Sequence, residues 1–196
     1  VSGVLHTSGR YLLDRCGNRL VIRGVENVLG NQLPQGNDWP GLIDDIAETG
    51  ANAVRILPVV TVLTTADVDA VLDRVEAHGM VAYISPWDRT WFGRTDVKAM
   101  LDTHEGSIII DAFQEPDYDN RTQWFTDVTA AIDQIRGYGY RVPITVLGNQ
   151  YGRDLPVVLQ RGAEVVAHDP LHNVILGWQA YWGSGGWYQS HYGMTV

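Results

Sequence analysis

Residues 52–88, NAVRILPVVTVLTTADVDAVLDRVEAHGMVAYISPWD, contain the pattern that decides the fold. Two apolar runs, at 52–59 and 80–88, have the composition of buried strands. Between them, residues 64–79 have the spacing of an amphipathic helix, which Thr65 is placed to cap and Gly79 to end. One side of this helix carries an apolar stripe, formed by Val68, Val71, Leu72 and Val75. The stretch therefore predicts a strand, a helix and a second strand.

The same alternation continues in both directions from this stretch. A short helix is expected at 41–50, and three further pairs of helix and strand at 96–106 and 107–116, 122–140 and 143–150, and 155–170 and 173–183. The apolar runs at 108–110 and 174–176 predict strands covered on both faces, as in a parallel sheet. Ahead of them, YLLDRCGNRLVIRGVEN (11–27) predicts a hairpin that leads into a strand at 20–26. We therefore expect a single α/β domain over residues 1–196.

Composition excludes several classes of function. The net charge is −9 with only 14 Lys and Arg residues, which argues against a nucleic-acid partner. No apolar run approaches the length of a membrane span, and no signal peptide is recognisable. The single cysteine, Cys16, excludes an internal disulfide and a multi-thiolate metal site, and the six histidines lack metal-binding spacing. We expect no metal and no cofactor.

Polar and aromatic residues lie at or near the end of every predicted strand of the parallel sheet. In a parallel α/β domain, chemistry gathers at the carboxyl ends of the strands. Each residue alone has an ordinary structural explanation, as a helix cap, an ion-pair strut or a lid on the core. Together they favour a sugar-binding rim, because glycans need stacking aromatic rings with amide and carboxyl partners. The rim residues are Glu26, Asn27, Arg55, Trp87, Asp88, Gln114, Glu115, Asn149, Gln150, Tyr151, Gln179, Tyr181 and Trp182.

Five segments resemble family 5 of the glycoside hydrolases, the cellulase and β-mannanase group of retaining β-glycosidases. They are LLDRCGNRLVIRGVEN (12–27), IAETGANAVRI (46–56), VEAHGMVAYISPWD (75–88), IIIDAFQEPD (108–117) and DPLHNVILGWQAYW (169–182). The resemblance implies a TIM-barrel-like (β/α)8 fold with about six βα units present and an N-terminal β-hairpin. It implies Glu115 as the general acid/base, Arg55 as the active-site arginine, and a β-linked polysaccharide of the mannan or cellulose class as substrate. It also implies secretion from the cell.

The chain departs from that family at several positions. Gln114 replaces the asparagine before the acid, while Trp87 and Gln179 replace histidines at strands three and six. The family nucleophile ends strand seven, whereas this sequence stops at Val196, so we expect a barrel truncated after strand six. A retaining mechanism needs two carboxyl groups about 5–5.5 Å apart, and a wider pair suits inversion. Glu26 and Asp88 are the candidates for the second carboxylate.

Two alternatives stay open at this point. One is a carbohydrate-binding protein that derives from such an enzyme and has lost catalysis. The other is a subunit that completes its barrel with a partner, because six strands leave two sheet edges without neighbours. A second copy in a homodimer, a partner chain or the aromatic segment GWYQSHYGMTV (186–196) would cover those edges.

Overall fold

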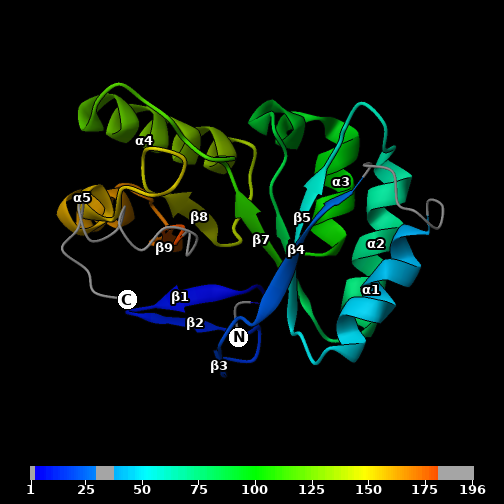
Figure 1. Cartoon of the computed structure of the whole chain (residues 1–196). Coiled ribbons are helices and arrows are strands. Elements are labelled where there is room, and N and C mark those ends of the chain that lie inside the picture. The colour runs from blue at the N-terminus through cyan, green and yellow to red at the C-terminus, as the bar shows by residue number, and fades with distance from the viewer. Residues whose placement is uncertain (1–2, 30–37, 181–196) are drawn as a thin grey trace.

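The computed structural model describes residues 3–29 and 38–180. Within these ranges, six parallel strands pair in chain order, β4-β5-β6-β7-β8-β9, and a separate antiparallel sheet has the order β1-β2-β3. Figure 1 shows the parallel sheet curling into part of a barrel, with the helices on its outer side and the small sheet across one end. This is the incomplete (β/α) barrel with an N-terminal hairpin that the sequence predicts.

The elements are β1 (His6–Ser8), β2 (Tyr11–Leu13), β3 (Arg19–Leu20), β4 (Gly24–Leu29), α1 (Trp39–Glu48), β5 (Ala53–Pro58), α2 (Thr65–Ala77), β6 (Val81–Ile84), η1 (Arg89–Gly93), α3 (Thr95–Thr103), β7 (Ile108–Asp111), α4 (Arg121–Gly137), β8 (Ile144–Leu147), α5 (Leu155–His168) and β9 (Val174–Gly177).

The unit formed by β5, α2 and β6 shows how the repeating pattern folds. The apolar stripe of α2 is buried against the outer face of the sheet. The helix starts with a capping box, in which the Thr64 hydroxyl accepts from the Asp67 N–H and the Asp67 carboxylate accepts from the Thr64 N–H. Thr64 is therefore the cap, and the prediction of Thr65 was wrong by one residue. Gly79 follows the helix with φ +65°, a conformation that glycine adopts without strain.

Strand register aligns side chains on the inner face of the sheet. Glu26 of β4 lies opposite Arg55 of β5, which lies opposite Tyr83 of β6. Alternate residues point outward into the main core under the helices, while a smaller apolar cluster of Leu5, Ala53, Val81 and Ile109 fills the base of the inner face. Because side chains alternate between the two faces of a strand, the polar residues of the inner face lie above this cluster, toward the carboxyl ends of the strands.

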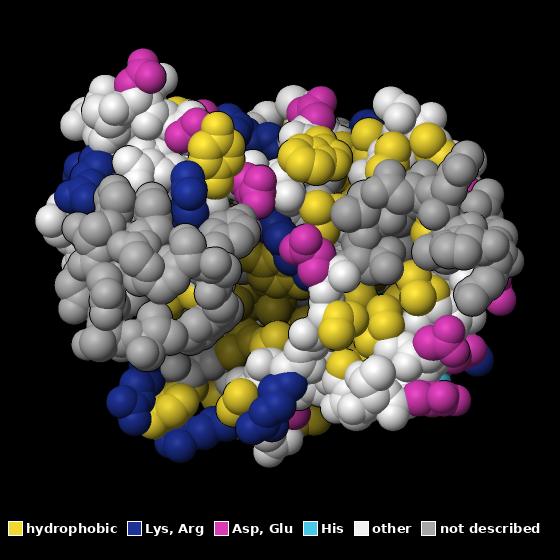
Figure 2. Space-filling view, viewed as in Figure 1, with side chains coloured by type: hydrophobic (Ala, Val, Ile, Leu, Met, Phe, Trp, Pro, Cys, Tyr) yellow, Lys and Arg dark blue, Asp and Glu magenta, His cyan; other side chains and the backbone are white. Residues whose placement is uncertain are grey.

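The N-terminal sheet differs from the predicted hairpin in two ways. A third strand, β1, pairs with β2, and the first strand of the parallel sheet begins at Gly24, so the strand expected at 20–26 was placed too early. Between this sheet and the inner face of β6, β7 and β9 lies a largely apolar hollow of about 760 Å³. Figure 2 shows a depression floored by hydrophobic side chains, with acidic and basic side chains above it. Ile175 and Leu176 border this hollow and are only half-buried, so β9 is less covered than expected.

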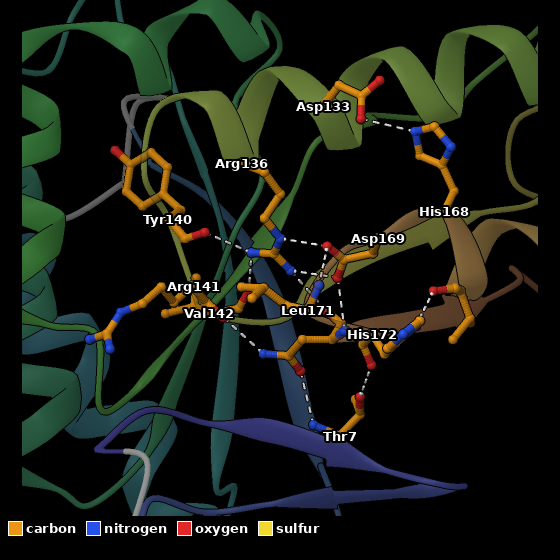
Figure 3. Close-up of polar contacts among 12 residues, drawn as sticks. Thr7, Asp133, Arg136, Tyr140, Arg141, Val142, His168, Asp169, Leu171 and His172 are labelled. Carbon is orange, nitrogen blue, oxygen red and sulfur yellow. Dashed lines mark hydrogen bonds and ion pairs between the residues drawn. The ribbon is translucent and has the colours of Figure 1, made fainter.

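A buried ion pair and the residues bonded to it link the N-terminal sheet to the segment between α5 and β9 (Figure 3). Arg136 of α4 donates to both carboxylate oxygens of Asp169, at 2.8 Å each, and Asp169 accepts from the Asn173 N–H at 2.8 Å. The Asn173 side chain then accepts from the Thr7 N–H at 2.9 Å and donates to the Leu5 carbonyl at 3.3 Å. The first strand is thereby tied to the residue that precedes the last strand.

Within the described ranges, no helix combines the length and the apolar character needed to cross a membrane.

Candidate active site

Arg55 is the centre of the polar cluster at the carboxyl edge of the sheet. Its guanidinium pairs with Glu26 and donates through Nη2 to Asp111 at 2.8 Å. The same Nη2 group lies 3.0 Å from Ser85 Oγ and 3.0 Å from Gln114 Oε1. The side chain is only 16% exposed. One arginine therefore joins groups from β4 and β7 and from the segments that follow β6 and β7.

Opposing effects act on the pKa values of Arg55 and Asp111. Burial lowers the pKa of Arg55. The Asp111 and Glu26 carboxylates raise this pKa by more than burial lowers it, so the net shift is upward. Burial raises the pKa of Asp111 above its usual range, against the lowering effect of Arg55 and of a 2.7 Å hydrogen bond from Ser85. The Asp111 carboxylate is fully buried and also accepts from the Phe113 N–H at 3.0 Å. The pair thus forms a desolvated support under the exposed rim.

Sequence reasoning missed Asp111 and Ser85. Both belong to segments that were interpreted only as strands, and both are contacts of Arg55. A signal for Asp111 was present, since it is an acid directly after an apolar run and a buried acid requires a partner. Ser85 lies two residues after Tyr83, the register neighbour of Arg55, so alternation places it on the same face.

Gln114 and Glu115 follow β7 directly. Gln114 Oε1 accepts from Arg55 at 3.0 Å, which fixes the orientation of its amide, and it lies 3.0 Å from the Ser85 Oγ atom, whose shorter contact is with Asp111. Glu115 is half-buried and has φ +47°, a left-handed conformation that is uncommon for a residue other than glycine. Backbone strain of this kind costs about 1–3 kcal/mol and concentrates at functional sites. The residue that the family resemblance marks as the acid is also one that the fold holds under strain.

A second loop fixes the segment that contains Glu115. The buried Asn149 side chain accepts from the Tyr118 N–H at 2.8 Å and donates to the Tyr118 carbonyl at 3.0 Å. The Tyr151 N–H donates to the Pro116 carbonyl at 2.9 Å. Gln150 and Tyr151 both have positive φ, of 55° and 59°. The Asn149 amide therefore holds the loop after β7, and its contact with substrate stays a prediction.

The other predicted rim residues lie apart from Arg55 or outside the described residues. Trp87 is 63% exposed, and Asp88 caps η1 through hydrogen bonds from the Thr90 N–H at 2.9 Å and hydroxyl at 2.7 Å. These bonds lower the pKa of Asp88. The Gln179 N–H donates to the Gly152 carbonyl at 2.8 Å, which places Gln179 beside the loop after β8. Tyr181 and Trp182 fall outside the described residues.

The carboxylates define what the arrangement can do chemically. Glu26 is half-exposed and joins the cluster through Arg55, so it can act on a solvent-accessible ligand. Asp111 is fully buried and is ion-paired with Arg55, so it cannot contact such a ligand. Both carboxylate oxygens of Asp88 are engaged by Thr90, which makes Glu26 the better candidate for the second carboxylate. Across residues 3–29 and 38–180, no three His, Cys, Asp or Glu side chains are grouped to hold a metal ion.

Comparison with solved structures shows the fold to be that of bacterial β-mannanases and β-glucanases. The catalytic domain of a mannanase from Streptomyces sp. SirexAA-E is 25% identical, with a TM-score of 0.77 over 90% of this chain and 61% of that one. The mannotriose complex of Thermomonospora fusca β-mannanase is 23% identical, with a TM-score of 0.79 over 95% and 70% of the two chains. A Saccharophagus degradans β-glucanase with cellotetraose is 16% identical, with a TM-score of 0.72 over 91% and 62%.

The chain thus spans 61% of the length of the Streptomyces domain and has a glycoside hydrolase-like fold over that part. No protein-family model matches the sequence, and no curated protein matches it.

Proposed function

We propose that this protein is a glycoside hydrolase that cleaves O-glycosyl bonds in a β-linked polysaccharide of the mannan or cellulose class. The observation that carries the proposal is the cluster of Arg55, Glu26, Asp111 and Gln114 beside the strained Glu115. The cluster lies at the carboxyl edge of a sheet whose fold is shared with β-mannanases. Several solved structures of this fold carry mannotriose, mannohexaose or cellotetraose, which supports an oligosaccharide ligand.

In this proposal Glu115 acts as the general acid. Its carboxyl proton passes to the glycosidic oxygen as the bond between that oxygen and the anomeric carbon breaks. Glu26 accepts a proton from a water molecule, whose oxygen attacks the anomeric carbon from the opposite face, so this reaction inverts the anomeric configuration, unlike that of the retaining family that the sequence resembles. The products are two sugars, and a proton returned from Glu26 through solvent to Glu115 completes the cycle. Arg55 orients Glu26 and Gln114, and Asp111 holds Arg55 in place.

The remaining rim residues would bind sugar. Gln114 has its amide orientation fixed beside the acid, and the exposed ring of Trp87 offers a stacking surface. We assign Gln179, Tyr181 and Trp182 to the same role. Because polysaccharides of this class do not enter cells, we place the protein outside the cell in this proposal.

The test is release of reducing sugar from β-mannan, glucomannan, cellulose, xylan and β-1,3-glucan, run beside Glu115→Gln protein prepared identically. A working acid/base contributes about 10²–10⁴-fold, so Glu115→Gln should lose activity by that factor. Glu26→Gln should lose a similar factor if Glu26 is the base, while Asp88→Asn should change little. Absence of hydrolysis by the unmodified chain on every substrate would overturn the proposal and leave a carbohydrate-binding protein as the explanation for the rim.

The sheet edges lead us to propose also that a second copy covers them in a homodimer. Among the described strands, β4 pairs only with β5 and β9 only with β8. Open edges of this kind favour association, because their backbone groups lack partners. Light scattering and amide hydrogen exchange should show a dimer with protected amides in β4 and β9. A monodisperse monomer with fast exchange at both edges would refute the homodimer.

A further inference from the structure

The backbone of Glu115, with φ +47°, lies between two parts of the segment after β7 that other elements hold. Before it, the buried Phe113 ring lies under the Arg89 guanidinium, whose central carbon is 5.6 Å from the ring centroid. After it, the Tyr118 N–H and carbonyl both bond to the side-chain amide of Asn149. A left-handed conformation of a residue other than glycine persists only where the surrounding structure holds it. The contacts on these two flanks supply that restraint.

One ion pair reaches both flanks of Glu115. Arg89 of η1 donates to both carboxylate oxygens of Asp127 in α4, at 2.9 and 3.1 Å. The Asp127 carboxylate also accepts from the Tyr118 hydroxyl. Arg89 therefore contacts the flank before Glu115 directly, at the Phe113 ring, and the flank after it through Asp127. The Arg89 and Asp127 side chains are 29% and 28% exposed, so the pair is partly shielded from solvent.

The Tyr118 hydroxyl is the link between this ion pair and the segment. Burial and the neighbouring Asp127 carboxylate raise the pKa of Tyr118, so the hydroxyl keeps its proton and can donate a hydrogen bond to that carboxylate. A hydrogen bond to a charged acceptor is stronger than one between neutral groups. The hydroxyl contributes this bond and no charge. Its removal therefore loosens the flank of Glu115 without changing the charge near it.

We propose that the Arg89–Asp127 pair, acting through Tyr118, positions Glu115 and so directs its carboxyl group at the glycosidic oxygen. This inference rests on the proposed function and adds to it residues that hold the acid rather than the sugar. A misplacement of about 1 Å can reduce the rate of an enzyme about 10²-fold. Loss of the link should therefore slow proton transfer from Glu115 and leave the binding of substrate nearly unchanged.

Tyr118→Phe removes only the hydroxyl and tests the link. We expect kcat to fall about tenfold to hundredfold, while KM stays within about twofold. Asp127→Asn removes the charge that pairs with Arg89 and should show the same division between kcat and KM. Tyr138→Phe is the matched control. The half-buried Tyr138 hydroxyl belongs to the same network, since it accepts from Gln134 at 2.8 Å, but Tyr138 caps the end of α4 and not the segment after β7.

The leaving group separates a misplaced acid from a general loss of structure. A dinitrophenolate leaves without a proton, whereas a phenolate needs one from the general acid. Tyr118→Phe and Asp127→Asn should therefore lose activity on phenyl β-glycosides and keep it on dinitrophenyl β-glycosides, as should Glu115→Gln. Damage to the fold as a whole would lower the rate on both substrates alike.

The experiment measures kcat and KM of the full chain and its variants on the phenyl and dinitrophenyl β-glycosides of mannobiose and cellobiose. Thermal unfolding shows which variants are folded, and Asp127→Asn decides the matter if Tyr118→Phe is not. A loss confined to the phenyl glycosides, and absent from Tyr138→Phe, would support the positioning role.

Three results would overturn the positioning role: no loss in the folded variants, equal losses on both leaving groups, or an equal loss in Tyr138→Phe. The proposed function would survive each of them if Glu115→Gln still lost activity on the phenyl glycosides alone. No hydrolysis by the parent protein, of these glycosides or of the polysaccharides, would overturn the proposed function and the positioning role with it.

Discussion

Replacement of Arg136 by methionine tests the reasoning about the buried ion pair in Figure 3. In the described residues the guanidinium contacts Asp169 twice and also donates to three backbone carbonyls, those of Tyr140, Val142 and Asn173. Asp169 is fully buried, and the Arg136 side chain is 8% exposed. Arg136→Met would leave a buried carboxylate without its cation, a change that costs about 3–5 kcal/mol. Proteins of this kind have a total unfolding free energy of about 5–15 kcal/mol, so the loss is large.

Urea unfolding, followed by tryptophan fluorescence at neutral pH, measures this loss. With an m value of about 2–3 kcal/mol/M, the midpoint should fall by about 1–2 M. Arg94→Met is the control, because the exposed Arg94–Asp96 pair contributes less than about 1 kcal/mol. Adding Asp169→Leu to Arg136→Met should recover part of the stability, since it removes the uncompensated charge. A midpoint shift for Arg136→Met no larger than that of the control would refute the reasoning.

The pH dependence supplies a second readout of the same pair. Burial raises the pKa of Asp169, but the hydrogen bonds and charge of Arg136 lower it more, so the folded-state pKa lies below its usual value. A depressed carboxyl pKa stabilises the folded state above the unfolded pKa of about 3.9, and this contribution is lost as the pH falls through the folded value. In Arg136→Met the same burial acts without the cation and raises the Asp169 pKa, so the variant loses stability as the pH rises from acid toward neutral. The stability difference between the parent and Arg136→Met should therefore be largest at neutral pH and narrow as the pH falls.

Two further substitutions test the site and the helix start. Asp111→Asn replaces one acceptor oxygen by a donor, so the side chain must lose either the bond from the Phe113 N–H or the bonds from Arg55 and Ser85. We expect the unfolding free energy, measured by urea unfolding, to fall by about 1–3 kcal/mol. An unchanged midpoint would contradict the role of Asp111 as a buried acceptor. Thr64→Ala removes the cap of α2 and should destabilise by about 1 kcal/mol in thermal unfolding, more than Thr65→Ala does; the reverse order would show that Thr65 is the cap.

The fold could be predicted because each βα unit carries its own signals. Helical spacing of apolar residues, followed by a glycine and an apolar run, recurs along the chain and is a local property. The three-residue β1 and the two-residue β3 are too short to show a period of two, so the start of β4 was misplaced. Pairing with neighbouring strands, which single-sequence patterns do not encode, decides those boundaries.

The sequence predicts which residues lie at strand ends, but it does not predict which of them contact one another. The structure brings Glu26, Arg55 and Gln114 together, whereas Trp87 and Asp88 lie on the other side of Gln114. Which side of a rim a loop residue faces depends on the turn that follows the strand, and η1 sets that turn for Trp87. Asp111 and Ser85 contact Arg55 because three strands align in one register, and register is not written in the pattern of any single strand.

The contact between Thr7 and Asn173 has a consequence for the order of folding. These residues are 166 positions apart in the chain, whereas each βα unit closes within its own local segment. A chain that leaves the ribosome from its N-terminus can pair β1 with β2 early, but the contact between β1 and Asn173 cannot form until the segment before β9 has emerged. Contacts of such long sequence separation slow folding, because the loop-closure entropy must be overcome before they form. The floor of the half-barrel is thus synthesised before the βα units described above and completed only after them.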